Sequence, residues 1–526
     1  MKKIRSIFAI LALLVQTVAL AQAQNPLIFA DVPDMSMIRV DKNYYMSSTT
    51  MHMNPGVPIM KSTDLVNWKI INYAYDTLAD LPALNLEEGK SIYSRGSWAS
   101  SLRYHNGTYY LAVFAQTTNE TYIFTTKDIE KGNWKRTSFK PALHDLSLFF
   151  DDDGKVYLIY DAERLKILEL NEDLTVNKNV PERVFIENGS APTGKEVGLK
   201  AEGSQLFKVK GKYYLFNICA PRGEMRTVLI HRADNINGPW EGKVALEDRG
   251  IAQGGLIDTP DGRWFSYLFR DYAAVGRVPY LVPVKWEDGW PVLGENGRVQ
   301  ETLDLPASKG LIPNLVASDE FKRKKREAAL PLVWQWNHNP DNALWSVTER
   351  KGFLRLKTGR IDTDFLQARN TLTQRTIGPT SSASVALDVS KMKDGDFAGF
   401  SVLQRKYGLV GVKIDAGQKS IVMISTDNDK PVEVKRIPLD QDQIYFRIDC
   451  DFTGMNDEAK NLWTLNGKDE ASFFYSLDGK VWKPIGQSLK MQYDIPHFMG
   501  YRFSLFNYAT KEIGGYVDFD WFRIKY

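Results

Sequence analysis

A short pattern of turn residues followed by aromatic and apolar residues recurs five times in the first 300 residues. Each copy places a turn before aromatic or apolar positions that open an alternating strand. The copies begin at Lys42, Asn106, Asp153, Gly211 and Asp261. Several are followed by a second phrase that ends in tryptophan, at Trp68, Trp134 and Trp240. Each unit is therefore typical of a few short antiparallel strands joined by tight turns.

A unit of ~50 residues that holds four strands and is repeated five times indicates a β-propeller. A lone blade cannot bury both of its faces, so the blades must pack radially around a channel. We therefore predict a five-bladed β-propeller over residues 25–316, and a pair of β-sandwiches is the alternative that the pattern leaves open. In a propeller, residues that are distant in sequence share one funnel at the channel mouth.

The blade pattern stops near Val316, and a second pattern of alternating strands runs to the C-terminus. Examples are residues 352–357 and 383–388, with few helical stretches between them. This predicts a jelly-roll β-sandwich over residues 317–526, so the whole chain is expected to be all-β. The length of 526 residues also exceeds what one hydrophobic core normally organises.

The first 24 residues have the three parts of a secretory signal peptide: a basic start, an apolar run over residues 7–15 and small residues before Gln24. We expect cleavage near residues 23–24 and export to a periplasm or outside the cell. No Cys follows the apolar run, and no later stretch approaches the ~20 apolar residues of a membrane helix, so no membrane anchor is expected. Cys219 and Cys450 lie far apart and are expected to be buried and unpaired.

Composition and charge exclude several classes of function. Hydrophobic residues at 43% and charged residues at 25% are ordinary for a globular protein. The net charge is +3, and basic and acidic residues are interleaved, so the basic stripe of a nucleic-acid-binding protein is absent. Aromatic residues reach 12%, which suits both pleated strands and sugar-binding surfaces.

Three carboxylates occupy matching places in different units. Asp34, Asp145 and Glu202 each come at the start of an expected inner strand, in the first, third and fourth units, and Asp31 is a near competitor of Asp34. An Asp in such a place is usually a turn former. Three of them on one axis form a cluster of like charge that folding does not require. Hydrolysis of a glycosidic bond, in contrast, needs a pair of facing carboxyl groups.

The segments 30–36, 48–57, 61–68, 145–154 and 202–206 resemble glycoside hydrolase family 43, in its β-xylosidase and α-L-arabinofuranosidase branch. Residues 330–339 and 365–370 resemble that branch's C-terminal concanavalin-like domain. The resemblance implies an inverting enzyme that acts on arabinose- or xylose-containing oligosaccharides and polysaccharides. It also implies that Asp34 is the general base, that Glu202 is the general acid, and that Asp145 raises the pKa of the acid and orients the substrate.

The same resemblance suggests substrate-binding residues. Arg277 corresponds to a substrate contact near the acids, although a structural salt bridge would also explain it. Trp98 matches a residue that lines the family's sugar pocket, and core packing is its alternative explanation. Met51 and His52 fall where related xylosidases carry bulky aromatics, so they are expected at an altered rim of the pocket.

The scheme requires no cofactor. Many family members hold calcium in the channel through a His, and this chain has Gln253 at that place, so structural calcium is left open. The run at residues 151–153 lacks the downstream pattern of an EF-hand and is expected to form a hairpin turn. The six His are scattered without ligand spacing, so no catalytic metal is predicted.

Four interpretations remain open at this point. The leading one is an exo-acting enzyme that releases terminal pentoses, and the sequence does not separate arabinose from xylose. An endo-arabinanase is less expected, because the extra domain resembles one that closes the pocket of exo-acting relatives. A non-catalytic carbohydrate-binding propeller is the alternative from another class, and the presence of all three acids argues against it. The second domain alone is also a candidate glycan-binding module.

Overall fold

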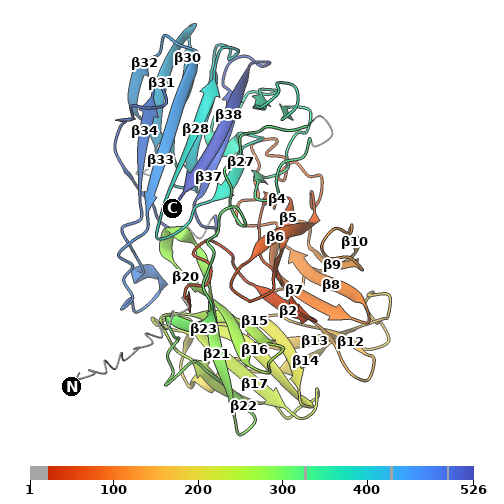
Figure 1. The fold of residues 1–526 in the computed structure, drawn as a ribbon. Helices are drawn as coiled ribbons and strands as arrows, with labels where there is room; N and C mark the ends of the chain where they lie inside the picture. The colour runs from red at the N-terminus through yellow and green to blue at the C-terminus, as the bar shows by residue number, and fades with distance from the viewer. Residues whose placement is uncertain (1–21, 325–327, 427–429, 494–496) are drawn as a thin grey trace, which may run out of the picture.

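The computed structural model describes residues 22–324, 328–426, 430–493 and 497–526, and the chain is all-β (Figure 1). Five four-stranded antiparallel sheets form the blades of a β-propeller, which confirms the predicted fold class. The first blade contains β2 (Ser36–Val40), β3 (Asn43–Ser47), β5 (Gly56–Ser62) and β6 (Lys69–Tyr75), and the second contains β7 (Ser97–His105), β8 (Thr108–Ala115), β9 (Glu120–Thr126) and β10 (Lys135–Phe139).

The other three blades follow in chain order. The third contains β11 (Ser147–Phe150), β12 (Val156–Tyr160), β13 (Leu165–Leu170) and β14 (Arg183–Ile186). The fourth contains β15 (Val197–Val209), β16 (Lys212–Pro221), β17 (Thr227–Ala233) and β18 (Glu241–Leu246). The fifth contains β19 (Ala252–Asp258), β20 (Trp264–Asp271), β21 (Arg277–Glu287) and β22 (Trp290–Leu293). The regular helical turns of the described residues are four short 3-10 segments, η1 (Ala191–Thr193), η2 (Ala273–Val275), η3 (Phe365–Gln367) and η4 (Leu462–Thr464).

The recurring sequence phrase forms the hairpin between the first and second strands of each blade. Asn106 and Gly107 have φ values of 46° and 75°, the left-handed pair that a two-residue hairpin turn requires. Residues 151–153 form the turn between β11 and β12, as predicted, with the Asp151 N–H donating to the Lys155 carbonyl at 2.9 Å. The aromatics that follow each turn are therefore placed in the second strand, where they pack between blades.

The inner strands β2, β7, β11, β15 and β19 each contact the inner strands of both neighbouring blades, so the ring is closed. Arg103 of β7 crosses the channel between them. Its Nη2 donates to Ser147 Oγ at 3.0 Å and to Gln205 Oε1 at 3.1 Å, in the third and fourth blades. The N-terminal strand β1 (Gln22–Gln24) pairs with β23 (Thr302–Pro306), the strand that follows the fifth blade.

The second domain is a sandwich of two eight-stranded sheets, the predicted concanavalin-like architecture. One sheet has the order β32 (Val432–Pro438), β31 (Gln418–Ser425), β30 (Gly408–Asp415), β29 (Asp396–Leu403), β37 (Arg502–Ala509), β27 (Leu372–Arg375), β24 (Gln335–Asn337) and β4 (Met53–Asn54). The other has β25 (Trp345–Ser346), β26 (Leu354–Lys357), β38 (Tyr516–Lys525), β28 (Thr380–Asp388), β33 (Gln443–Asp451), β34 (Glu470–Ser476) and β35 (Lys483–Pro484), with β36 (Leu489–Lys490) also on β34. Aromatic rings such as Phe400, Phe503 and Phe522 fill the space between the sheets.

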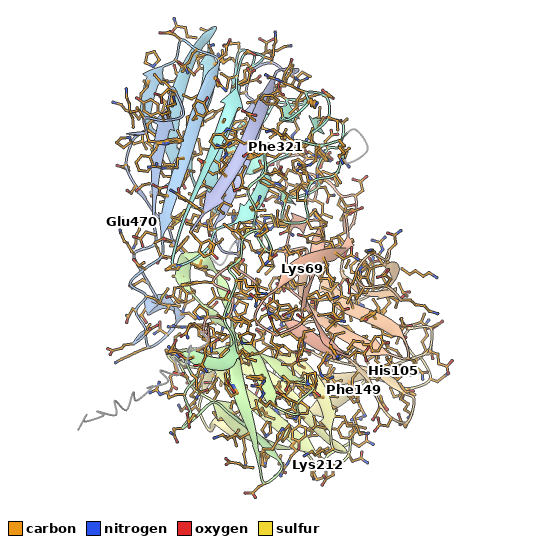
Figure 2. The ribbon with its side chains drawn as sticks, viewed as in Figure 1. Lys69, His105, Phe149, Lys212, Phe321 and Glu470 are labelled. Atoms are coloured by element: carbon orange, nitrogen blue, oxygen red, sulfur yellow. The ribbon has the colours of Figure 1, made fainter. Side chains whose placement is uncertain are left out.

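The two domains share secondary structure as well as side chains. Strand β4 belongs to the connection between β3 and β5 of the first blade, yet it pairs with β24 and completes a sheet of the sandwich. Nearby, the buried Asp31 carboxylate accepts the N–H of Arg277 at 2.8 Å and the N–H of Gly500 at 3.0 Å. Figure 2 shows side chains filling the space between the propeller and the sandwich. The sandwich is therefore fixed against one face of the propeller.

Two further predictions concern the ends and the cysteines. Cys219 and Cys450 are both buried free thiols, as expected. The predicted signal peptide falls mostly on residues 1–21, which lie outside the described residues, while Gln22–Gln24 form β1. Within the described ranges, no helix is long and apolar enough to cross a membrane.

Candidate active site

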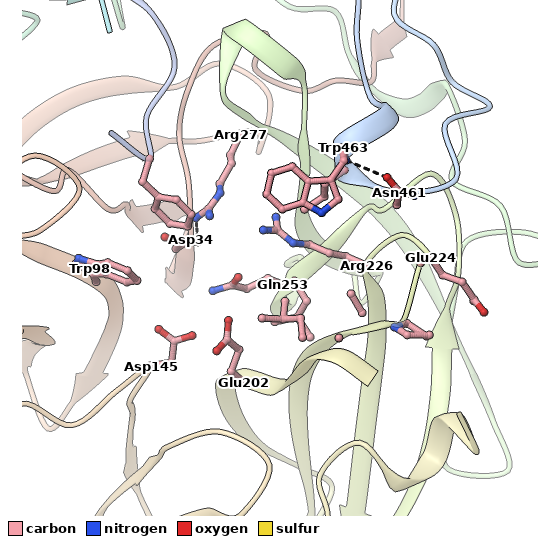
Figure 3. Close-up of a pocket in the computed structure, with 18 of the residues that line it drawn as sticks. Asp34, Trp98, Asp145, Glu202, Glu224, Arg226, Gln253, Arg277, Asn461 and Trp463 are labelled. Carbon is pink, nitrogen blue, oxygen red and sulfur yellow. Dashed lines mark hydrogen bonds and ion pairs between the residues drawn. The ribbon is translucent and has the colours of Figure 1, made fainter. Parts of the chain in front are cut away.

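The three predicted acids surround one cavity at the mouth of the channel, on the face of the propeller that the sandwich covers (Figure 3). The cavity measures about 420 Å³, within the range of ~300–1,000 Å³ that is usual for small-molecule sites. Trp98 and Arg277 line it together with Asp34, Asp145 and Glu202. The fold therefore brings together five of the seven residues that the sequence singled out.

The backbone directs the three acids toward the channel, Asp34 and Asp145 from equivalent places and Glu202 from a different one. Asp34 and Asp145 each lie two residues before an inner strand, with φ values of 50° and 47°. This left-handed conformation is uncommon for residues other than glycine, and non-glycine examples gather at functional sites. Glu202 was expected at the start of its strand, but it lies within β15, where the register with β16 is interrupted on both sides of it. Such a bulge redirects a side chain that would otherwise follow the strand.

Asp34 is held by two donors. Thr49 Oγ1 donates to Asp34 Oδ2 at 2.7 Å, and Arg277 Nη1 donates to Asp34 Oδ1 at 2.8 Å. The Arg277 guanidinium also lies 3.9 Å from the centre of the Phe498 ring. Arg277 is thus both a structural ion pair and part of the cavity wall, so its two expected roles coexist. The orientation of the Asp34 carboxylate is fixed before any ligand enters.

On the opposite side of the cavity, His144 joins the other two acids. His144 Nε2 lies 3.0 Å from Glu202 Oε2 and 3.8 Å from Asp145 Oδ2. Burial raises the pKa of Asp145 to about 7, with Glu202 and Asp34 adding to the rise and His144 opposing it. Burial opposes the charge on His144, but the two neighbouring carboxylates raise its pKa to about 9, so His144 is cationic at neutral pH. That Asp145 in turn raises the pKa of Glu202 stays a prediction.

Comparison with known proteins places this arrangement in a family. Residues 23–291 match the family model for glycosyl hydrolases family 43, and residues 318–525 match the model for the beta xylosidase C-terminal concanavalin A-like domain. The chain belongs to glycosyl hydrolases family 43. It is accordingly a glycoside hydrolase. The sequence resemblance to this family and to its C-terminal domain is confirmed.

Two curated relatives match most of the chain. A β-xylosidase of Formosa agariphila is 30% identical over 562 residues, a match that covers 95% of this chain and 90% of that protein. A non-reducing end α-L-arabinofuranosidase of Bacteroides ovatus is 26% identical over 466 residues, covering 82% of this chain and 84% of that protein.

Solved family 43 structures share the two-domain fold. A Bacteroides eggerthii protein described as a bifunctional GH43-CE is 64% identical with a TM-score of 0.92, and the match covers 96% of this chain. The chain spans 64% of the length of that protein. An engineered GH43 enzyme described as having both endo-xylanase and exo-arabinofuranosidase activity is 28% identical with a TM-score of 0.82, and the match covers 96% of this chain and all of that one.

Several residues of the family 43 cavity were missed by sequence reasoning. Phe498 comes from the second domain, and its ring stacks on Trp98 with centroids 5.4 Å apart. Trp463 reaches the cavity from the same domain, and Arg226 reaches it from the fourth blade. No local sequence signal marks these three, because their position depends on how the domains and blades meet. His144, in contrast, directly precedes Asp145, and this adjacency was a usable signal.

Met51 and His52 do not line the cavity, which corrects the prediction that they form its rim. Met51 is buried, has a φ of 53° and bridges to Ser97. His52 lies instead in the contact between the domains, with its ring centroid 4.7 Å from those of Tyr93 and His338. Burial lowers the pKa of His52 to about 3, so it is neutral. The chain enters the sandwich as β4 directly after His52.

The site also contains one group of ligand atoms that could hold a cation. His144, Asp145 and Glu202 place one ligand atom each within 4.8 Å of one another. A metal ion bound there would engage two of the three carboxyl groups that the sequence predicts to be catalytic. Gln253 of β19 lines the same cavity, and the expectation about calcium at that position stays open.

Proposed function

We propose that this family 43 chain is an exo-acting, inverting hydrolase that releases terminal α-L-arabinofuranosyl or β-D-xylosyl residues from plant cell-wall polysaccharides and oligosaccharides. The observation that carries the proposal is the placement of Asp34 across one cavity from Glu202 and Asp145 (Figure 3). The sandwich domain contributes Phe498 to the wall, which favours binding of a chain end over an open cleft. The relatives named as a β-xylosidase and an α-L-arabinofuranosidase support the sugar class.

The roles that we propose for the acids are those that the resemblance to family 43 implies. Glu202 gives its proton to the departing oxygen, and Asp34 takes a proton from a water molecule on the opposite face of the sugar. Inversion requires room for that water between the sugar and the base, so the two carboxyl groups of inverting enzymes lie ~6.5–9.5 Å apart. Arg277 and Thr49 orient Asp34 for this task. Asp145 acts as a positioning residue, and its charge interacts electrostatically with Glu202 and with the sugar.

Release of nitrophenol from an aryl α-L-arabinofuranoside and an aryl β-D-xylopyranoside, measured side by side, tests the proposal. Wild-type protein should hydrolyse at least one of them. Asp34→Ala should lose nearly all of that activity, and Glu202→Ala should lose a smaller part, because nitrophenolate departs with little help from an acid. The substrate that reacts faster identifies the preferred pentose. A folded wild-type protein that is inactive on both glycosides would contradict the proposal.

The charge of His144 predicts a change in pH dependence. His144 lowers the pKa of Asp145, so His144→Asn should raise that pKa further above about 7. If ionised Asp145 is needed for turnover, the acidic limb of the kcat/KM profile moves to higher pH by roughly one unit. The matched control is His105→Asn at the other end of the propeller (Figure 2), which should leave the profile unchanged. An acidic limb that stays in place in His144→Asn would rule out this coupling.

We also propose that the protein is exported and that its leader ends before Gln22, slightly earlier than the cleavage near residues 23–24 that the sequence predicts. Strand β1 (Gln22–Gln24) pairs with β23, and Ala23 is buried, so cleavage within residues 22–24 would remove part of a sheet. The intact mass of the mature protein distinguishes a start at Gln22 from a later start or an uncut chain.

A further inference from the structure

One aromatic side chain at the mouth of the cavity is not used by the proposed chemistry. Trp463 lies on η4, in the loop of residues 452–469 that joins β33 to β34 of the sandwich. The residue is 84% exposed, the highest value among the exposed large apolar residues of the described chain. It nevertheless lines the same cavity as the three acids, and Figure 3 shows its indole on the side of the cavity that carries Arg226.

The loop holds Trp463 in a fixed place. Arg270 of the propeller pairs with Asp457 of the loop at 2.6 Å. The Asn456 N–H donates to the Asn466 carbonyl at 2.8 Å, which closes the loop on itself. The Asn461 side chain accepts the N–H groups of Trp463 and Thr464 in a complete capping box. A side chain on such a support starts from an ordered backbone, so less conformational entropy is lost when it binds.

The position of Trp463 separates it from the site of bond cleavage. Trp98 and Phe498 stack beside the acids and enclose the inner part of the cavity. Trp463, Asn461 and the exposed Glu224 line the same cavity on the side away from Asp145 and Glu202 (Figure 3). A pyranose ring has an apolar C–H face and a polar edge of hydroxyl groups. A flat indole bordered by charged and amide groups is complementary to both.

We propose that Trp463 and Asn461 form a subsite for the second sugar, the pyranose ring to which the terminal pentose is linked. The inference rests on the proposed function. It extends that function from recognition of the terminal pentose to recognition of the leaving group, the sugar to which the pentose is attached. The indole stacks on the apolar face of this ring, and the amide of Asn461 faces its hydroxyl groups. The enzyme should therefore favour oligosaccharides over glycosides whose aglycone is a single methyl group.

Kinetics on two classes of substrate test this subsite. Methyl β-D-xylopyranoside and methyl α-L-arabinofuranoside fill only the inner cavity, whereas xylotriose and an arabinofuranosyl-substituted xylotriose also reach Trp463. Trp463→Ala should lower kcat/KM for the oligosaccharide about tenfold, mainly through KM, and leave the methyl glycoside within twofold. Trp463→Phe, which keeps an aromatic face, should recover much of the loss.

The matched control is Tyr104→Ala, an aromatic that is 43% exposed at the far end of the propeller, and it should leave the substrate ratio unchanged. An unchanged ratio in Trp463→Ala would overturn the subsite while leaving the proposed function intact. Equal losses on both classes of substrate would also overturn it, because they indicate a structural effect. Wild-type protein that hydrolyses no pentoside would overturn the proposed function and this inference together.

Discussion

Replacing Glu202 with glutamine is expected to lower kcat by about 10²–10⁴-fold for substrates with a sugar or methyl leaving group, because the amide has no proton to give to the departing oxygen. The loss should be much smaller for a 2,4-dinitrophenyl pentoside, whose phenolate departs without protonation. Asp34→Asn should lower kcat to a similar extent for both leaving groups, because activation of water is needed in every case. The measurement is kcat for each variant with each leaving group.

This contrast assigns the two roles more sharply than loss of activity alone. Glu202→Gln keeps the shape of the side chain and an oxygen beside His144 Nε2, so the fold should be retained. Thermal melting of both variants serves as the control. Equal losses for good and poor leaving groups in Glu202→Gln would show that Glu202 is not the general acid.

Replacing Asp31 with alanine is expected to destabilise the protein by about 3–5 kcal/mol. Its buried carboxylate accepts the N–H groups of Arg277 and Gly500, so alanine leaves two buried donors without a partner. Arg375 and Arg502 also lose a compensating charge. Burial raises the pKa of Asp31, which offsets part of its contribution. Differential scanning calorimetry should show a melting temperature lower by roughly 5 °C or more.

Two further variants serve as controls for the loss of stability in Asp31→Ala. Asp31→Asn keeps one acceptor oxygen and should lose less than alanine does. Asp304→Ala removes a carboxylate that is exposed on the propeller surface, and it should change stability by no more than ~0.5 kcal/mol. A melting temperature for Asp31→Ala equal to that of wild type would show that the contact between Asp31 and Gly500 does not hold the domains together.

The propeller and its acids were predictable because they depend on local and repeated features. The turn before each aromatic pair specifies a hairpin, as the left-handed pair Asn106 and Gly107 shows, and five such hairpins specify the ring. Asp34 and Asp145 were found from their place before an inner strand, which the structure confirms. Sequence position could not distinguish Asp31 from Asp34 in this way. The two residues are only three positions apart, yet Asp34 faces the cavity and Asp31 contacts the sandwich.

The rest of the site depends on contacts between distant parts of the chain. Phe498 and Trp463 reach the cavity only because the sandwich packs on the propeller, and no period in the sequence encodes that placement. The prediction for Met51 and His52 failed for the same reason, since the segment after them leaves the blade to become a strand of the other domain. His144 is charged because Asp145 and Glu202 raise its pKa, and Glu202 belongs to the next blade.

The central claim is that Asp34 directs water to the face of the sugar opposite the bond that Glu202 helps to break. The most direct measurement is proton NMR of the first pentose released from an aryl β-D-xylopyranoside, recorded before mutarotation equilibrates the anomers. The account predicts that α-xylose appears first and that the β-anomer grows later. First appearance of β-xylose would contradict it, because retention requires a carboxylate that attacks the sugar itself.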